Sequence, residues 1–172
     1  MAELKDSGRR REFESGAVRD IAEGKGRCDL LPLDVCAKIF SSLEGDKISE
    51  SVLDDIDHYV RTGSYLELIA AIGDFNDLSG NSVSQCLLDL AKHYEDGAVK
   101  YSARNWERGI PLHCFIDSGV RHYLKYIRGD RDEPHDRAFV WNMVGAIWTQ
   151  KHHPELVDLP FAEVKSDEDS SH

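Results

Sequence analysis

Residues 112–128, with the sequence LHCFIDSGVRHYLKYIR, are the segment that decides the fold class. Large apolar side chains recur in it three or four residues apart, at Leu112, Phe115, Ile116, Val120, Tyr123, Leu124 and Ile127. Because a helix places such positions on one face, this segment is predicted to be an amphipathic helix that ends at Gly129.

A second helix is expected over residues 135–152, HDRAFVWNMVGAIWTQKH, and Pro154 limits its extension. Its apolar side chains surround the helix on almost every side, which is typical of a buried helix. The polar side chain of Asn142 lies within this run. A buried amide needs hydrogen-bond partners, so Asn142 either contacts a neighbouring helix or faces a polar cavity.

The first half of the chain contains start and stop signals for further helices. Asp34 is expected to cap one helix, and a second is expected between Ser49 and Gly63. Residues 64–67 and 82–85 have the spacing of capping boxes and open two more. No segment alternates polar and apolar residues over a useful length, so the predicted fold is all-α, with five or six helices.

The chain is expected to form one helical domain over residues 1–160. Residues 44–81 are predicted to be an insert, a helical hairpin that decorates the bundle. Glycines in residues 15–32 indicate a shaped loop, preceded by a mobile basic arm that includes RRR at 9–11. The acidic, serine-rich residues 161–172 are expected to be a disordered tail.

Charge is unevenly distributed along the 172 residues, whose net charge is −11. Residues 44–77 hold 9 acids and 2 bases, whereas residues 78–153 hold 9 acids and 10 bases. The net charge disfavours binding to nucleic acids or membranes, but the C-terminal half can still bind a polyanion. Without an apolar signal segment, a membrane-length run or a CxxC motif, the chain is expected to be a soluble cytoplasmic protein with reduced thiols.

Residues 94–109, YEDGAVKYSARNWERG, combine cations, carboxylates, an amide and aromatic rings at the end of a predicted helix. Lys100, Arg104 and Arg108 recur every four residues and would form one cationic stripe on a helix. The alternative is a charged surface turn in which Trp106 only fills space.

A second group of polar residues follows in residues 117–136. Asp117, Arg121 and Lys125 share one helix face, and His122 beside them is either a hydrogen-bonded core residue or a ligand. Residues 129–136, GDRDEPHD, place carboxylates and a histidine at the start of the last helix. These acids either interact with the helix dipole or form a site for Mg²⁺ or Mn²⁺, which prefer oxygen ligands.

Three segments together resemble a phage-associated family of dATP/dGTP diphosphohydrolases (N-terminal domain), which is associated with MazG-like all-α nucleotide pyrophosphohydrolases. They are residues 24–32 (GKGRCDLLP), residues 94–109, and the pattern Arg121-His122, Gly129, Asp132-Glu133, His135 and Asn142. Two features differ from the pattern. Ala138 stands where members often carry a second histidine, and the paired ExxE and ExxD carboxylates of MazG-like metal sites are missing.

The resemblance implies a MazG-like helical bundle that hydrolyses dATP or dGTP to the monophosphate and pyrophosphate, with Mg²⁺ or Mn²⁺ as cofactor. It implies that Glu95, Asp132 and Glu133 hold the metal, and that Glu95, Asp132 and His135 are catalytic. The nucleotide-binding residues that it implies are Arg27, Asp29, Lys100, Tyr101, Arg104, Asn105, Trp106, Arg121, His122 and Asn142.

The missing carboxylate pairs support a second hypothesis, a non-catalytic phage protein that sequesters nucleotide immune signals such as cyclic dinucleotides or ADP-ribose derivatives. Under both hypotheses the partner is a purine nucleotide, and the expected location is the cytoplasm of an infected bacterial host. Three tryptophans and a helix that is apolar on all sides also predict a homo-oligomer.

Overall fold

The computed structural model describes residues 8–45 and 47–162, and it is mostly helical, as the sequence predicts. Its α-helices are α1 (Leu33–Phe40), α2 (Glu50–Thr62), α3 (Tyr65–Ser79), α4 (Val83–Tyr101), α5 (Leu112–Arg128) and α6 (His135–His152). Short 3₁₀ helices lie at Cys28–Leu30, Asn105–Arg108 and Pro154–Leu156. The only sheet in the described ranges consists of β1 (Arg10–Glu12) and β2 (Val18–Asp20).

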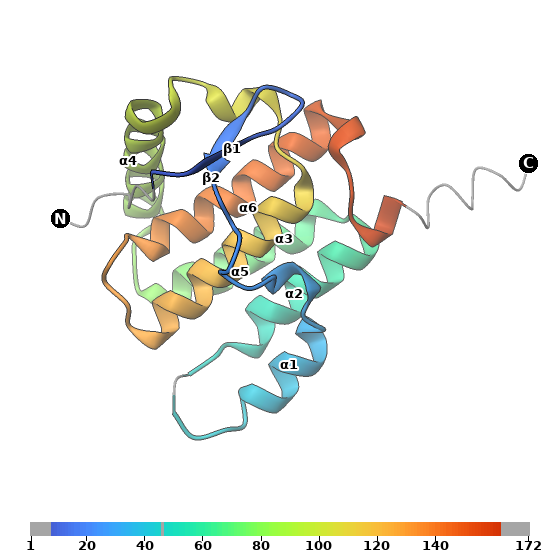
Figure 1. The fold of residues 1–172 in the computed structure, drawn as a ribbon. Helices are drawn as coiled ribbons and strands as arrows, with labels where there is room; N and C mark the ends of the chain where they lie inside the picture. Colours follow the sequence, from blue (N-terminus) through green and yellow to red (C-terminus); the bar gives the residue numbers. More distant parts are fainter. Residues whose placement is uncertain (1–7, 46, 163–172) are drawn as a thin grey trace, which may run out of the picture.

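Helices α5 and α6 lie side by side at the centre of the molecule (Figure 1). Two glycines allow their backbones to approach closely. A Cβ atom on Gly119 would lie 2.3 Å from the Cε atom of Met143, and one on Gly145 would lie 2.4 Å from Phe115. Neither position has room for a side chain, so this helix pair depends on glycine at both.

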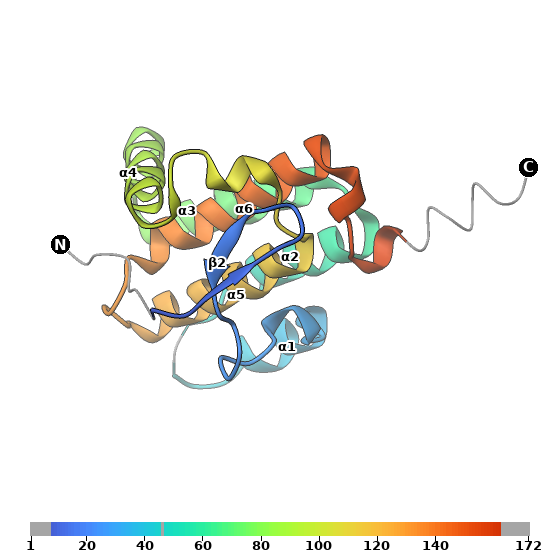
Figure 2. The same ribbon diagram turned by 45° about the horizontal axis from the view of Figure 1, so that its top comes forward.

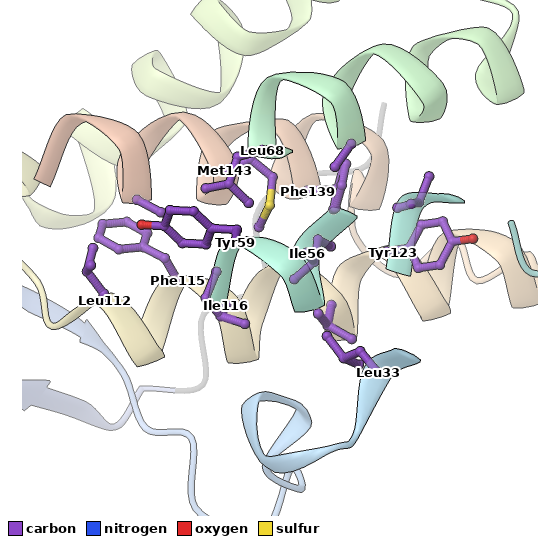
Figure 3. Close-up of a cluster of buried hydrophobic side chains, with 14 of the residues drawn as sticks. Leu33, Ile56, Tyr59, Leu68, Leu112, Phe115, Ile116, Tyr123, Phe139 and Met143 are labelled. Carbon is purple, nitrogen blue, oxygen red and sulfur yellow. The ribbon is translucent and has the colours of Figure 1, made fainter. Parts of the chain in front are cut away.

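Helices α2 and α3 form the helical hairpin expected for residues 44–81, but the hairpin belongs to the core instead of decorating it. Figure 3 shows Tyr59 of α2 packed among Phe115, Ile116 and Met143. In α3, the ring of Phe75 lies 4.6 Å from that of Phe139 in α6. Each of the two helices has an apolar stripe that needs cover, and α5 and α6 provide it.

The N-terminal segment differs from the predicted arm and loop, because β1 and β2 pair in antiparallel register. The hairpin crosses α5 and α6 in both ribbon views (Figures 1 and 2). Asn105 holds it there: its Oδ1 accepts the Val18 N–H and its Nδ2 donates to the Val18 carbonyl, both at 2.9 Å. Three-residue strands that rely on a partner 87 positions away leave no periodic signal. Residues 1–7 of the predicted arm lie outside the described residues.

The capping predictions are confirmed only in part. The Ser82 hydroxyl accepts the N–H of Gln85 at 3.2 Å, which is the predicted cap of α4. Ser64 is the N-cap residue of α3, but its side chain makes no capping hydrogen bond. The prediction for Asp34 is wrong, because Pro32 precedes α1 and Asp34 lies within its first turn, where a carboxylate interacts with the helix dipole.

After α6 the chain returns to the core. Leu159 and Phe161 are buried, and the ring of Phe161 lies 5.8 Å from that of Tyr59. Residue 161, the first of the predicted tail, is therefore packed, and residues 163–172 lie outside the described part of the chain. Among the described helices, none has both the length and the apolar character needed to cross a bilayer.

Candidate functional site

A cavity of about 790 Å³ lies where the β1–β2 hairpin, the end of α4 and the loop after it face α5 and α6. Eight cationic side chains but only five carboxylates line it, in a chain whose net charge is −11. The cationic residues are Arg11, Arg19, Lys25, Arg27, Lys100, Arg104, Arg121 and Lys125. This local excess of positive charge favours a polyanionic ligand.

Arg19 of β2 lies against the central helices. Its guanidinium donates to the Cys114 carbonyl at 3.0 Å and to Asn142 Oδ1 at 2.9 Å, and its Cζ lies 5.5 Å from the centre of the Trp141 ring. Burial lowers the pKa of Arg19, although an arginine retains its charge near neutral pH. Arg19 is not recognisable from the sequence, since a single arginine in a glycine-rich segment has no distinguishing pattern.

Asn142 combines the two alternatives that the sequence left open. It lines the cavity, and both polar atoms of its amide have a partner, because Nδ2 donates to the Ala138 carbonyl at 2.8 Å while Oδ1 accepts from Arg19. The arrangement orients the Arg19 guanidinium and makes Asn142 a positioning residue in the cavity wall.

Lys100 and Tyr101, both expected to contact a nucleotide, line the cavity near the hairpin. The Lys100 ammonium lies 2.7 Å from Asp20 Oδ2, and the Tyr101 hydroxyl donates to Asp20 Oδ1 at 2.9 Å. The hydrogen bond to Asp20 is one of the contacts that raise the pKa of Lys100 and offset its burial. Asp20 therefore ties the end of α4 to β2, and it was another residue that the sequence did not reveal.

Aromatic rings form one wall of the cavity. The rings of Tyr94 and Trp106 lie 5.3 Å apart, and Tyr94 also contacts Trp141 at 6.2 Å. On its other side Trp106 packs edge-on against Trp148, at 4.8 Å. Trp106 therefore packs against its neighbours, as expected if this loop were only a surface turn, but its ring also lines the cavity.

The loop after α4 contains two non-glycine residues with left-handed backbone conformations, Ser102 (φ 96°) and Arg104 (φ 60°). Such conformations are costly and concentrate at functional sites. Arg104 lines the cavity, is largely exposed and pairs with Glu107. The buried Asn105, which also lines the cavity, uses its amide to bind the backbone of Val18 and thereby positions the hairpin.

The segment 24–32 lies against α5 in the same chain. Arg121 Nη2 contacts both carboxylate oxygens of Asp117 at 2.6 Å and donates to the Gly26 carbonyl at 2.7 Å. Arg27 lines the cavity and pairs with Asp29 at 2.5 Å, whereas Asp29 is not among the lining residues. The structure thus brings the first and third of the resembling segments together.

A chain of polar contacts joins α5 to the start of α6. The Nδ1 atoms of His122 and His135 lie 2.9 Å apart, and His135 Nε2 lies 2.9 Å from Asp132 Oδ1. Burial and the neighbouring His135 hold the pKa of His122 well below its usual value, so His122 is neutral. The hydrogen bond from His135, aided by Lys125, lowers the pKa of Asp132 to about 2.

The same residues are suited to a metal ion. Ligand atoms of His122, Glu133 and His135 lie within 4.8 Å of one another, as do those of Asp130, Asp132 and His135. Asp132, Glu133 and His122 also line the cavity. A divalent cation held here would be next to a ligand bound in the cavity.

Glu95 lies apart from this group. Its carboxylate is exposed, pairs with Lys92 at 2.5 Å and is not among the residues that line the cavity. Two residues earlier, His93 does line the cavity: it is buried, its Nδ1 has no partner in the described structure, and burial lowers its pKa to about 3. Two positions on a helix differ by about 200°, which separates these two side chains.

Fold and cavity together define a helical protein with a cationic, aromatic-walled ligand site. A family model described as dATP/dGTP diphosphohydrolase, N-terminal, matches residues 74–159, and the chain belongs to this family. The all-α fold is consistent with a MazG-like helical fold, and the family implies a nucleotide substrate. No curated protein and no solved structure matches the chain. The match begins within α3, so it includes the loop after α4 and the histidine pair but not the hairpin that carries Arg19.

Proposed function

We propose that the chain is a metal-dependent diphosphohydrolase that cleaves dATP or dGTP in this cavity, giving the monophosphate and pyrophosphate. The observation that carries the proposal is the cationic lining of one cavity in an acidic chain. Phosphoryl transfer depends mainly on positioning and on compensation of charge, and this lining provides both for a triphosphate. Membership of the family supports the same substrate class.

The base would bind at the aromatic end of the cavity, where Tyr94 and Trp106 offer ring surfaces for stacking. The phosphates would extend toward Arg121 and Lys125, which line the cavity beside the histidine pair. Arg19 is positioned between these ends by Asn142 and would contact the sugar or the first phosphate.

The divalent cation would bind at His135, either with His122 and Glu133 or with Asp130 and Asp132, and Glu95 is left out because of its position. When bound, such an ion neutralises phosphate charge and activates the attacking water. Asp132 accepts a hydrogen bond from His135 and thereby orients that ring. Lys125, 3.3 Å from Asp132 Oδ2, adds to the effect of the His135 hydrogen bond in lowering the pKa of that carboxyl group, and it lines the cavity, where it would contact a phosphate.

A second candidate function is binding without catalysis. Four of the five lining carboxylates pair with a cation of the protein itself: Asp20 with Lys100, Glu107 with Arg104, Asp117 with Arg121, and Asp132 with Lys125. Within the described ranges, only Glu133 has no such ion pair among the lining carboxylates. Carboxylates that already pair with cations of the protein are less available to a catalytic metal ion. A site of this kind therefore also suits a protein that binds and sequesters a nucleotide signal without cleaving it.

Incubation of the pure chain with dNTPs and NTPs plus Mg²⁺ or Mn²⁺, followed by chromatography, tests the proposal. Monophosphate and pyrophosphate that disappear with EDTA are expected. Glu133→Gln should reduce turnover by about 100-fold, equivalent to about 2.7 kcal/mol in the activation barrier. The exposed Glu155→Gln serves as the matched control. If all nucleotides are recovered unchanged, the enzyme proposal fails, and release of an intact nucleotide on heating supports the binding function.

We also propose that residues 1–160 fold as one domain that forms homo-oligomers. The first part is supported by the shared core of α2, α3, α5 and α6. The second is supported by apolar side chains on the outer sides of α1 and α4, where Ile39 is 51% and Leu87 is 65% exposed. The apolar helix α6, which prompted this prediction, is covered within the chain itself. A monomeric mass by light scattering at micromolar concentration would contradict the oligomer.

A further inference from the structure

The two histidines that meet between α5 and α6 have the geometry of a nitrogen-ligand pair. Their Nδ1 atoms are 2.9 Å apart. With metal–nitrogen bonds of about 2.0–2.1 Å, as for zinc, two nitrogens lie about 2.9 Å apart at the right angle of an octahedral ion and about 3.3 Å apart at the tetrahedral angle that zinc prefers. The pair therefore has the spacing of two adjacent ligands on a single metal ion.

Asp132 determines which nitrogen of His135 is available. Because His135 Nε2 donates its hydrogen to Asp132 Oδ1, its Nδ1 carries the lone pair that points toward His122. A carboxylate behind a histidine in this way fixes the tautomer and the ring orientation at many metal sites. His135 is buried, so its ring has little freedom to turn away.

Glu133 supplies an oxygen within 4.8 Å of one ring nitrogen of each histidine. It lines the cavity together with His122, whereas His135 lies behind them. The alternative group of Asp130, Asp132 and His135 is less suited, because Asp130 pairs with Arg128 at 2.5 Å and Asp132 pairs with Lys125. A metal bound by the two histidines and Glu133 would keep its remaining positions open toward the cavity.

We propose that His122, His135 and Glu133 bind one first-row transition metal ion, such as Mn²⁺, Fe²⁺, Co²⁺ or Zn²⁺, in preference to Mg²⁺, and that Asp132 is the positioning residue behind His135. The chemical reason is that imidazole suits transition metals, whereas Mg²⁺ demands oxygen ligands and retains its water. This inference deepens the proposed function, on which its catalytic meaning rests, and it moves His122 from the nucleotide to the metal.

The test uses the full chain, stripped with EDTA and without nucleotide. Co²⁺ is titrated while its visible d–d absorption is recorded, and Mg²⁺ is then added in hundredfold excess. One equivalent of Co²⁺ should bind and most of it should remain. His122→Gln should weaken Co²⁺ binding at least tenfold, and Asp132→Asn about tenfold. His152→Gln, an exposed histidine at the other end of α6, should bind like the parent chain.

The inference is overturned if Co²⁺ does not bind at one equivalent, if Mg²⁺ displaces it at equal concentration, or if His122→Gln binds it like the parent. Thermal melting of each variant establishes that it is folded. Nucleotide turnover separates the two proposals. Equal turnover by parent and His122→Gln with Mg²⁺ alone rejects the transition-metal site and leaves the proposed function standing. Tight Co²⁺ binding without any nucleotide turnover supports the transition-metal site and rejects the proposed diphosphohydrolase function.

Discussion

Replacement of Asn105 by Ala tests whether this one side chain holds the hairpin against the cavity. Asn105 is buried, and its amide makes both of its hydrogen bonds to the backbone of Val18. Each hydrogen bond lost from a buried site costs about 1–1.5 kcal/mol, so the hairpin should lose about 2–3 kcal/mol relative to a detached state. A change of about 2 kcal/mol raises the detached population about 30-fold.

Hydrogen exchange is followed at Val18, whose amide donates to Asn105 itself, and at Ile21, whose amide donates to the Arg9 carbonyl and keeps this acceptor in the variant. Protection of both amides should fall about 30-fold in Asn105→Ala, while amides inside α5 and α6 stay as in the parent chain. Nucleotide affinity should fall as well, since Arg19 and Asp20 lie on β2. Asn81→Ala, in the turn between α3 and α4, is the matched control. Unchanged protection at Val18, or an equal loss throughout α5, would refute the reasoning.

Three further predictions concern affinity, packing and pH. Arg19→Met should weaken nucleotide binding at least tenfold by calorimetry. It should also lower the free energy of unfolding by about 2–3 kcal/mol, because Asn142 Oδ1 and the Cys114 carbonyl each lose a hydrogen bond. Equal affinity would remove Arg19 from the site. Gly119→Ala should cost about 1–3 kcal/mol in urea unfolding through its clash with Met143, whereas Gly73→Ala, with open space around its Cβ, should be neutral or stabilising. Asp158 raises the pKa of His113 to about 10, so the stabilisation is complete below pH 6.5 and disappears as the pH rises through 10. Asp158→Asn should therefore cost about 1 kcal/mol near pH 6 and nothing above pH 10, and a cost independent of pH would contradict the ion pair.

Much of the helical fold follows from local patterns. The apolar periodicity predicts helices over about 112–128 and about 135–152, which correspond to α5 and α6, and Gly129 and Pro154 lie just beyond their ends. The position of each helix in the molecule could not be inferred in the same way. The segment predicted to decorate the bundle supplies Tyr59 and Phe75 to the core, because periodicity shows that a helix has an apolar face but not what covers that face.

The site divides in the same way. Four of the eight cations that line the cavity, and three of its five Phe, Tyr and Trp rings, lie in residues 94–109 and 117–136, the two segments that the sequence pattern indicates. The predicted grouping of Glu95 with Asp132 is not seen, because the two lie apart, and Arg19, Asp20 and His93 were not among the predicted site residues. Each of these three residues is ordinary in its local context. Their importance comes from the elements that fold against them.

By itself, then, the sequence determined the helices and some of their caps and ends, because these depend on residues within a few turns of one another. It also determined the uneven distribution of charge and, through recognisable segments, the family. Tertiary structure alone decided which side chains share the cavity, how Asn105 and Asn142 use their amides, and that His122 meets His135. Apart from the local hydrogen bond from Asn142 to Ala138, those contacts join residues 13 to 123 positions apart, and their geometry depends on how the helices pack, which no local pattern specifies.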